Sequence, residues 1–195
     1  MADIFLKLMD GGKRVIDGES LDEAMPRPHE GEIEIRDWTW KIDNSATVQK
    51  GASNGSGGSN GSGGSEESES GGTDVISKPK LLNITLFKYC DLASVNLMRY
   101  CLKKKIIPKA QIFCRKNFGE YKHEFLILEL TNVRIHHVEL KGILDGDIVH
   151  EEVQLQFGTF KFQYTQQGNE EFVTGRDGTR TSSVGWDVTK NRPMD

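Results

Sequence analysis

Two adjacent histidines, His136 and His137, are the first residues whose chemistry could define a site, because imidazole nitrogens are common metal ligands. They lie in the run "YKHEFLILELTNVRIHHVEL", which reads as a strand, so their side chains are expected to point to opposite faces. A single metal ion could then not bind to both. We interpret them as surface or interface histidines, and we predict no metal site.

Two charged segments could also bind ions. The segment 145–152, "DGDIVHEE", has four carboxylates but lacks the ligand spacing of a calcium loop, and we interpret it as a solvated turn that leads into a strand. The run "KKK" at 103–105 could contact phosphate, but it follows an expected helix, where the helix dipole favours positive charge. No GxSxG, HExxH, P-loop or Cys/His pairing stands in the strand, turn and helix context that its chemistry requires; the two GxSxG matches fall within the Gly/Ser repeat of 51–72. We therefore predict no catalytic residues and no cofactor.

Composition and charge limit the classes of protein to which this chain can belong. The chain has 195 residues, of which 36% are hydrophobic, and this length fits one domain. Its 25 basic and 29 acidic residues give a net charge of −4, without the basic excess that nucleic-acid binding requires. The N-terminus does not read as a secretory signal, and no stretch is long and apolar enough to insert into a membrane. The cysteines Cys90, Cys101 and Cys114 lie in predicted strand or helix interiors, and we expect them to be reduced core residues.

Most of the chain alternates as β-strands, and several strands change phase. In "ADIFLKLM", Ile4, Leu6 and Leu8 share one face. In "EIEIRDWTWKI", the apolar phase slips near Arg36, which predicts a bulge there and places two tryptophans on one face. The slip in "EVQLQFGTFKFQY" falls at Gly158. Residues expected in the core are Trp38, Trp40, Phe157, Phe160 and Trp186.

One segment has helical rather than strand periodicity. In "CDLASVNLMRYCLKKKIIP", apolar residues recur at helical spacing, Ser94 is the expected N-cap, and the helix is expected at about 95–104. Bulged strands with one helix predict a mainly β fold, a compact β-barrel of two curved antiparallel sheets with one flanking α-helix.

The segment 51–72 separates two parts of the predicted sheet. It contains nine Gly and seven Ser, and it repeats "SNGSGG" in tandem. A chain of this composition has little to bury, which predicts a flexible loop with a reach of roughly 25 Å. The chain is therefore read as a single domain, 1–195, with a Gly/Ser-rich insertion that is either natural or engineered.

Several motifs, in order, resemble the hemolysin-coregulated protein (Hcp) family, the tube proteins of the bacterial type VI secretion system. They are "ADIFLKL", "GES" at 18–20, His29, "EIEI" with "WTW", "FKYCDLAS", "EVQLQF", "KFQY" and "GWDVTKN". The resemblance implies a barrel like that of phage tail tubes, rings of six copies, and rings stacked into an expelled tube whose lumen carries small effectors.

The resemblance also implies roles for particular residues and partners. Thr39, between the two tryptophans, would face the lumen, and Asp43, Asn44 and Ile76 would belong to the loop that makes ring or stacking contacts. The partners implied are further copies of the chain, the type VI spike protein, the sheath and small effectors. The implied location is the bacterial cytoplasm, followed by secretion without a signal peptide.

Two other classes of function stay open on the residues alone. Exposed aromatic side chains on a monomeric β-sandwich would suit a ligand-binding module, for example one that binds carbohydrate. An enzyme is the third reading. The oligomeric state in solution separates a ring of six from a monomeric binding module.

Overall fold

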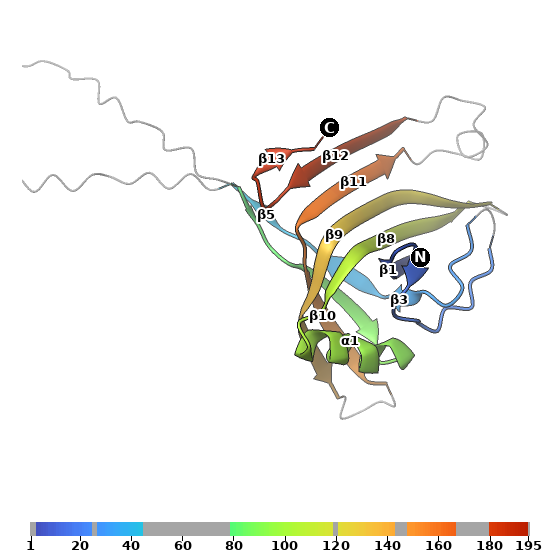
Figure 1. Cartoon of the computed structure of the whole chain (residues 1–195). Coiled ribbons are helices and arrows are strands. Elements are labelled where there is room, and N and C mark those ends of the chain that lie inside the picture. The colour runs from blue at the N-terminus through green and yellow to red at the C-terminus, as the bar shows by residue number, and fades with distance from the viewer. Residues whose placement is uncertain are drawn as a thin grey trace, which may run out of the picture.

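A computed structural model describes residues 3–24, 27–44, 79–118, 121–142, 148–166 and 180–194, and these are mainly β-strands with one helix (Figure 1). The predicted loop 51–72 and Ile76 lie outside the described residues. The elements are β1 (Asp3–Asp10), β2 (Lys13–Arg14), β3 (Ile33–Ile35), β4 (Asp37–Thr39), β5 (Ile42–Asp43), β6 (Lys80–Leu81), β7 (Ile84–Tyr89), α1 (Leu92–Leu102), β8 (Ile106–Phe118), β9 (Tyr121–Lys141), β10 (His150–Gln156), β11 (Thr159–Thr165), β12 (Thr181–Asp187) and β13 (Arg192–Pro193).

Strand β9, with 21 residues, is the spine of the sheet. Along one edge it pairs with β8, and along the other it pairs first with β11 and then with β10, all antiparallel. Strands β10 and β11 thus follow one another along β9, with a break where the sequence changes phase. At this break the Gly158 amide donates to the Thr131 carbonyl oxygen over 2.9 Å. A Cβ at Gly158 would lie 3.2 Å from that of Asn132, so the close approach favours glycine.

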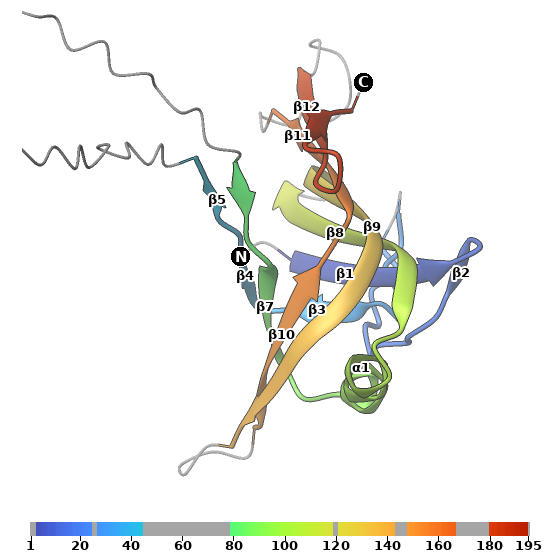
Figure 2. The same cartoon turned by 60° about the vertical axis from the view of Figure 1, so that its left-hand side comes forward.

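Eleven strands form one curved sheet, and β5 and β6 form a separate two-stranded sheet. The main path runs β13-β12-β11-β9-β10-β7-β4, while β8, β1, β3 and β2 extend from the other edge of β9. The described strands form no closed barrel, so the expected closure is not found. The curvature is visible in Figure 2, where the sheet bends round from β4 and β7 on the left, through β10 and β9, to β11 and β12 at the top.

The phase change near Arg36 marks a change of strand partner rather than the expected bulge within one strand. Before it, β3 pairs with β1; after it, β4 pairs with β7. The Arg36 amide itself donates to the Phe87 carbonyl oxygen over 2.8 Å. One short segment therefore joins two parts of the sheet that are distant in sequence. The apolar side chains before and after Arg36 both pack towards the core.

The core lies on the concave side of the sheet. Leu6 and Leu8 of β1 are buried and Ile4 is packed against them, which confirms the inward face predicted from alternation. Full burial of a Leu or Ile side chain contributes about 1.5 to 3 kcal/mol, so a core of this kind holds the curved sheet together. Other fully buried members come from β7, β8, β9 and β10: Ile84, Leu86, Ile107, Ile112, Leu128, Leu130, Val133, Val153 and Leu155.

Helix α1 closes one side of this core, below the sheet in Figure 1. It begins earlier than expected, at Leu92, because Asp91 is the N-cap and accepts a hydrogen bond from the Ala93 amide. Ser94 is instead the third helical residue, and its side chain accepts from the Asp91 amide, which completes a capping box. Leu97 is the buried anchor of the helix. No helix in the described residues is long and apolar enough to cross a membrane.

The cysteines differ in environment more than the sequence predicted. Cys114 is buried, and burial raises the pKa of its thiol to about 11. Cys101 is half-buried, whereas Cys90 is exposed, because it follows the end of β7 and precedes the helix cap. The expectation of a core position is therefore wrong for Cys90. All three cysteines are free thiols.

Candidate functional site

One face of the sheet carries a row of polar side chains across four strands. In register, Thr39 of β4 lies opposite Thr85 of β7, Thr85 opposite Gln154 of β10, and Gln154 opposite His137 of β9. Cross-strand partners of this kind point to the same face of a sheet. Thr39 and His137 are exposed, and the two residues between them are half-buried. We call this row, Thr39, Thr85, Gln154 and His137, the polar row.

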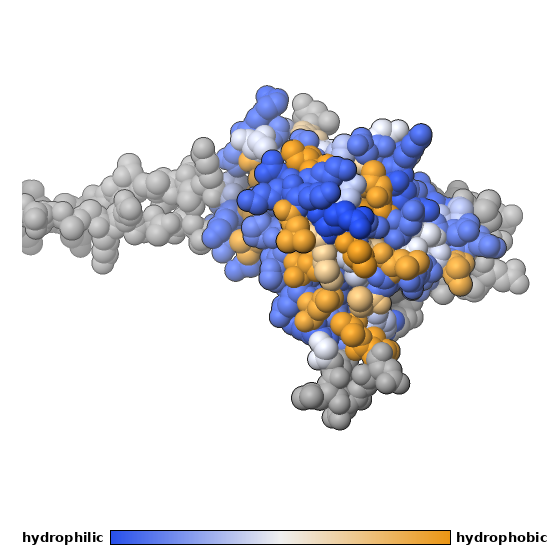
Figure 3. All heavy atoms as spheres, turned by 60° about the horizontal axis from the view of Figure 1, so that its bottom comes forward, coloured by the Kyte–Doolittle hydropathy of each residue, from blue (hydrophilic) through white to orange (hydrophobic). Residues whose placement is uncertain are grey.

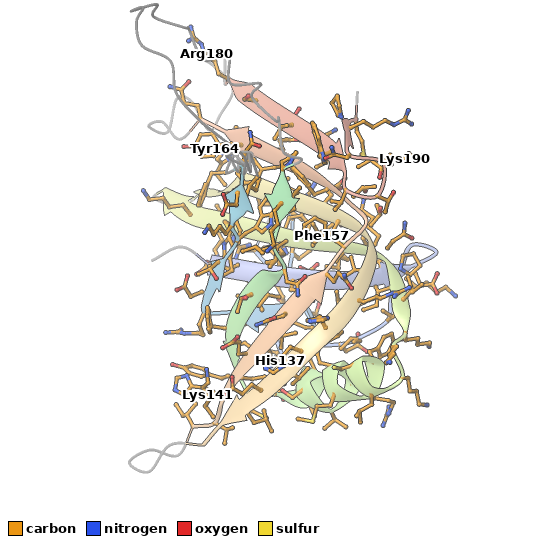
Figure 4. All side chains as sticks on the ribbon, turned by 90° about the vertical axis from the view of Figure 1, so that its left-hand side faces the viewer. His137, Lys141, Phe157, Tyr164, Arg180 and Lys190 are labelled. Atoms are coloured by element: carbon orange, nitrogen blue, oxygen red, sulfur yellow. The ribbon has the colours of Figure 1, made fainter. Side chains whose placement is uncertain are left out.

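Charged side chains lie next to the polar row, towards the end of β9 and the start of β10. Lys141 Nζ lies 3.0 Å from Glu152 Oε2 and 3.3 Å from Glu139 Oε2. Gln154 Nε2 donates to Glu152 Oε1 over 3.1 Å. The hydrogen bonds from Lys141 and Gln154 lower the pKa of Glu152, so this carboxylate stays ionised. The face is hydrophilic, and its charges are largely paired. Figure 4 labels His137 and Lys141 on it.

The histidine pair does not alternate as the sequence predicted. Strand β10 shifts register between Gln154 and Leu155, so Leu155 pairs with Ile135 while Gln154 pairs with His137. His136 is the extra residue of this bulge, and both histidines are exposed. Their expected placement on opposite faces is therefore wrong. No group of three or more potential metal ligands occurs in the part of the chain that the structure describes.

The aromatic residues expected in the core fall into two groups. Phe157 and Phe160 are buried, with exposed fractions of 8% and 4%. Trp38, Trp40 and Trp186 are partly buried and pack against the core from its rim. Trp40 makes edge-on contacts with both phenylalanines, at ring-centroid distances of 5.8 Å to Phe157 and 4.8 Å to Phe160. Thr39 thus lies between two tryptophans that turn to the core side.

Of the residues expected in a contact loop, two are described. Asp43 ends β5 and is half-buried, with its carboxylate 3.5 Å from Lys41 Nζ. Asn44 follows it and is exposed. Asp43 belongs to the short sheet of β5 and β6, in which Ile42 lies opposite Leu81.

Comparison with known proteins decides the family. The model of the family described as "Type VI secretion system effector, Hcp" matches residues 5–164. The chain belongs to the Hcp family of the type VI secretion system. Protein hcp1 of Pseudomonas aeruginosa strain PAO1 is 30% identical over 114 residues, which cover 58% of this chain and 68% of the relative.

Two solved structures share the fold. Hcp1 from Salmonella typhimurium superposes with a TM-score of 0.67 at 30% identity, and the match covers 99% of each chain. A type VI secretion system effector from Yersinia pestis gives a TM-score of 0.61 at 25% identity, covering 95% of this chain and 100% of the other. The open, mainly β sheet described above is therefore the fold of this Hcp-family chain.

Sequence reasoning missed a buried charge cluster that anchors the helix of this Hcp-family chain. Lys88 Nζ lies 2.8 Å from Glu151 Oε2 and 2.7 Å from Asp91 Oδ1, and it also donates to Ser94 Oγ over 3.1 Å. Ser94 Oγ in turn donates to Glu151 Oε2 over 2.7 Å. The cluster therefore joins β7, β10 and the N-terminus of α1. The motif "FKYCDLAS" contains three of its members.

A second buried cluster surrounds His29. Its ring stacks on Phe5 at 4.2 Å, its Nδ1 lies 2.8 Å from Glu32 Oε2, and its Nε2 lies 3.1 Å from Glu124 Oε1. Burial opposes the charged imidazolium, but hydrogen bonds to Glu124 and Glu32 outweigh it and raise the pKa of His29. Lys7 pairs with Glu32 over 3.0 Å. The cluster fastens the segment that precedes β3 onto β1 and β9.

Proposed function

We propose that this chain is the tube subunit of a type VI secretion system, in which six copies form a ring and the rings stack into the tube that the system expels. The lumen of this tube carries and stabilises small effectors. Family membership supports the assignment to the system. The spike protein, the sheath and effectors are the partners proposed, and the route is from the bacterial cytoplasm to the outside without a signal peptide.

The observation that carries the proposal is the polar face of the sheet. A channel wall needs a broad hydrophilic surface on a rigid support, because a filled channel contains water and cargo. The polar row meets this need, and the sheet behind it is fixed by fully buried residues such as Leu86 and Val153. In the proposed ring, Thr39 faces the lumen. Its small hydroxyl adds no charge and both donates and accepts hydrogen bonds.

The loop residues take a second role in this proposal. Asp43 and Asn44 lead into the segment that resembles the extended loop of the family, and Ile76 belongs to its returning arm. We assign these three residues to contacts between copies, either around the ring or between stacked rings. Asp43 belongs to the separate two-stranded sheet of β5 and β6, not to the sheet that carries the polar row, which supports a role outside the lumen.

Light scattering coupled to size-exclusion chromatography tests the ring directly. The expected mass is about six times that of the chain, and electron microscopy of the same fraction should show rings with a central opening. A second arm compares culture supernatants of strains with an active and an inactive type VI system, and the chain should accumulate outside only in the first. If the chain stays monomeric at high concentration, the proposed ring is refuted.

A further inference from the structure

The C-terminal end of α1 and the turn after it carry positive charges that have no acidic partner. Arg134 of β9 joins them, because it lies opposite Ile106 in the register of β8 and β9. None of these charges forms an ion pair with a residue that the structure describes, although the net charge of the chain is −4. Like charges gathered in this way repel one another, so they favour an anionic surface supplied by another molecule. We call this group the basic end, and its five members are all exposed: Arg99, Lys103, Lys104, Lys105 and Arg134.

The helix dipole accounts for only part of the basic end. Lys103 is the C-cap of α1, where a positive charge is favoured, and its amide donates to the Arg99 carbonyl oxygen over 3.1 Å. Lys104 has a φ of 50°, a left-handed conformation in which glycine is the usual residue after a helix. A lysine at this position therefore adds charge where glycine would relieve backbone strain. Arg134 stands on a strand and is not part of the helix terminus at all.

Apolar side chains are exposed beside the basic end. Leu102, the last residue of α1, is 84% exposed, and Ile106, the first residue of β8, is 49% exposed. Leu92, Val95 and Leu102 recur at helical spacing, which places them on one side of α1, opposite the buried Leu97. We call these three exposed residues the outer stripe. Figure 3 views the molecule from the side of α1, where hydrophobic and hydrophilic residues lie next to one another on the surface.

The surface of an anionic bilayer matches this combination of charge and apolar area. A nucleic acid would neutralise the basic end through its phosphates but would leave the outer stripe in water. A protein partner would need a groove shaped to receive a helix that stands outside the sheet (Figure 1). A bilayer needs no such groove. The apolar side of a surface helix enters the boundary below the lipid headgroups, while Lys and Arg side chains extend to the phosphates.

We propose that α1 and the turn after it form a docking surface for membranes that contain anionic phospholipids. The outer stripe enters the lipid interface, and the basic end contacts the lipid phosphates. The contact is peripheral, because α1 has 11 residues and a helix needs about 20 to span a bilayer. The inference goes beyond the proposed function. It does not depend on the ring, since one copy of the chain carries the whole surface.

Vesicle flotation of the full chain tests the charge contribution. Wild type should bind vesicles of equimolar phosphatidylcholine and phosphatidylglycerol far more tightly than vesicles of phosphatidylcholine alone, and salt should release it. The triple variant Lys103→Gln/Lys104→Gln/Lys105→Gln should bind the anionic vesicles roughly 100-fold more weakly, because each lysine near such a surface contributes about fivefold. The matched control removes three exposed lysines from other strands and should bind nearly as wild type does: Lys13→Gln/Lys80→Gln/Lys161→Gln.

The variant Leu102→Ser tests entry into the bilayer. It keeps every charge but removes the most exposed side chain of the outer stripe, so binding to anionic vesicles should weaken by roughly tenfold. Binding to duplex DNA, a polyanion without an apolar phase, should not change between wild type and this variant. If Leu102→Ser binds the vesicles as tightly as wild type, the basic end attracts anions without entering a membrane, and the proposal is wrong.

Two further results would overturn the proposal. One is a wild type that does not bind anionic vesicles at low salt, which leaves an acidic protein as the partner of this surface. The other is equal vesicle binding by the triple variant and its matched control. Should the triple variant not fold by circular dichroism, hydrogen exchange on wild type decides. The amides of 99–106 should exchange more slowly with anionic vesicles than with phosphatidylcholine vesicles, and equal exchange contradicts docking. A chain that is monomeric in light scattering can still pass these tests, so this proposal and the ring fail separately.

Discussion

Lys88 and Glu151 form an ion pair of 2.8 Å in which both residues are almost completely buried, with exposed fractions of 2% and 1%. Such a pair is fixed by its neighbours, since the Lys88 ammonium also donates to the Tyr89 carbonyl oxygen and to the helix N-cap Asp91. The relationship ties two adjacent strands to the start of the helix. Its energetic consequence depends on whether one partner or both are removed.

Lys88→Met should therefore be strongly destabilising. It leaves the buried Glu151 carboxylate without its cation, and loss of one partner from a buried pair costs about 3 to 5 kcal/mol. The double variant Lys88→Met/Glu151→Leu should recover much of this loss, because it removes both charges. Urea unfolding of wild type, Lys88→Met, Glu151→Leu and the double variant gives the coupling free energy between the two residues. A double variant no more stable than Lys88→Met would show that the destabilisation does not come from the unpaired charge.

The His29 cluster predicts a pH dependence of stability. The pKa of His29 in the folded protein lies above its ordinary value of 6.5, because Glu32 and Glu124 stabilise the imidazolium. The stabilisation is therefore fully present below 6.5 and is lost as the pH rises through the folded pKa. Glu32 does not reverse this trend, because its pKa is lowered from 4.5 and it remains ionised over the same range.

The variant His29→Gln isolates this contribution. The difference in unfolding free energy between wild type and variant should be largest below pH 6.5 and should shrink as the pH rises through the raised pKa of His29. Lys7 and Arg27, which pair with Glu32 and Glu124, remain in both proteins, so their contribution largely cancels. His136→Gln changes an exposed position and serves as the control. A difference that is constant with pH would mean that His29 stabilises the fold by packing on Phe5 alone.

Edge-on aromatic contacts at the rim of the core provide a third prediction. Phe160 is 4% exposed, and Phe160→Ala should cost about 3 to 5 kcal/mol through the cavity it leaves. Trp40 is only partly buried, so Trp40→Ala should cost less despite the larger side chain. Because the two rings touch, the double variant should lose less unfolding free energy than the two single variants lose together. The difference should be about 0.5 to 1.5 kcal/mol. Chemical denaturation of the four proteins measures this, and strict additivity would contradict a direct contact.

Local sequence patterns predicted the elements better than their partners. Alternation placed Ile4, Leu6 and Leu8 on the core face, and helical spacing located α1 to within a few residues. The change of partner at Arg36 and the bulge at His136 were not predictable in the same way. Both depend on which distant strand lies alongside, and strand register is set by the pairing as a whole rather than by the local segment.

The candidate site was predictable to a similar degree. Thr39 could be assigned to the face opposite Trp38 and Trp40, but its neighbours Thr85 and Gln154 emerged only from the strand pairing. The buried position of Lys88 had a local signal, because it shares the inward phase of Ile84 and Leu86. A lysine in that phase indicates a buried partner, but the partner, Glu151, lies on a strand that only the fold brings alongside.

The last prediction concerns the proposed lumen. Thr39→Gln adds a longer uncharged side chain at an exposed position, so the melting temperature and ring mass should change little. Repeated around the ring, the longer side chain narrows the lumen at the level of Thr39 and should reduce the effectors that co-purify with the protein. Thr39→Ser keeps the hydroxyl and the small size, and it should retain cargo as wild type does. Mass spectrometry of co-purifying material compares the three proteins. If wild type and Thr39→Gln carry equal cargo, with rings intact in both, Thr39 lies outside the cargo-binding part of the lumen. A loss of cargo confined to Thr39→Gln would support the polar row as the inner wall of the tube.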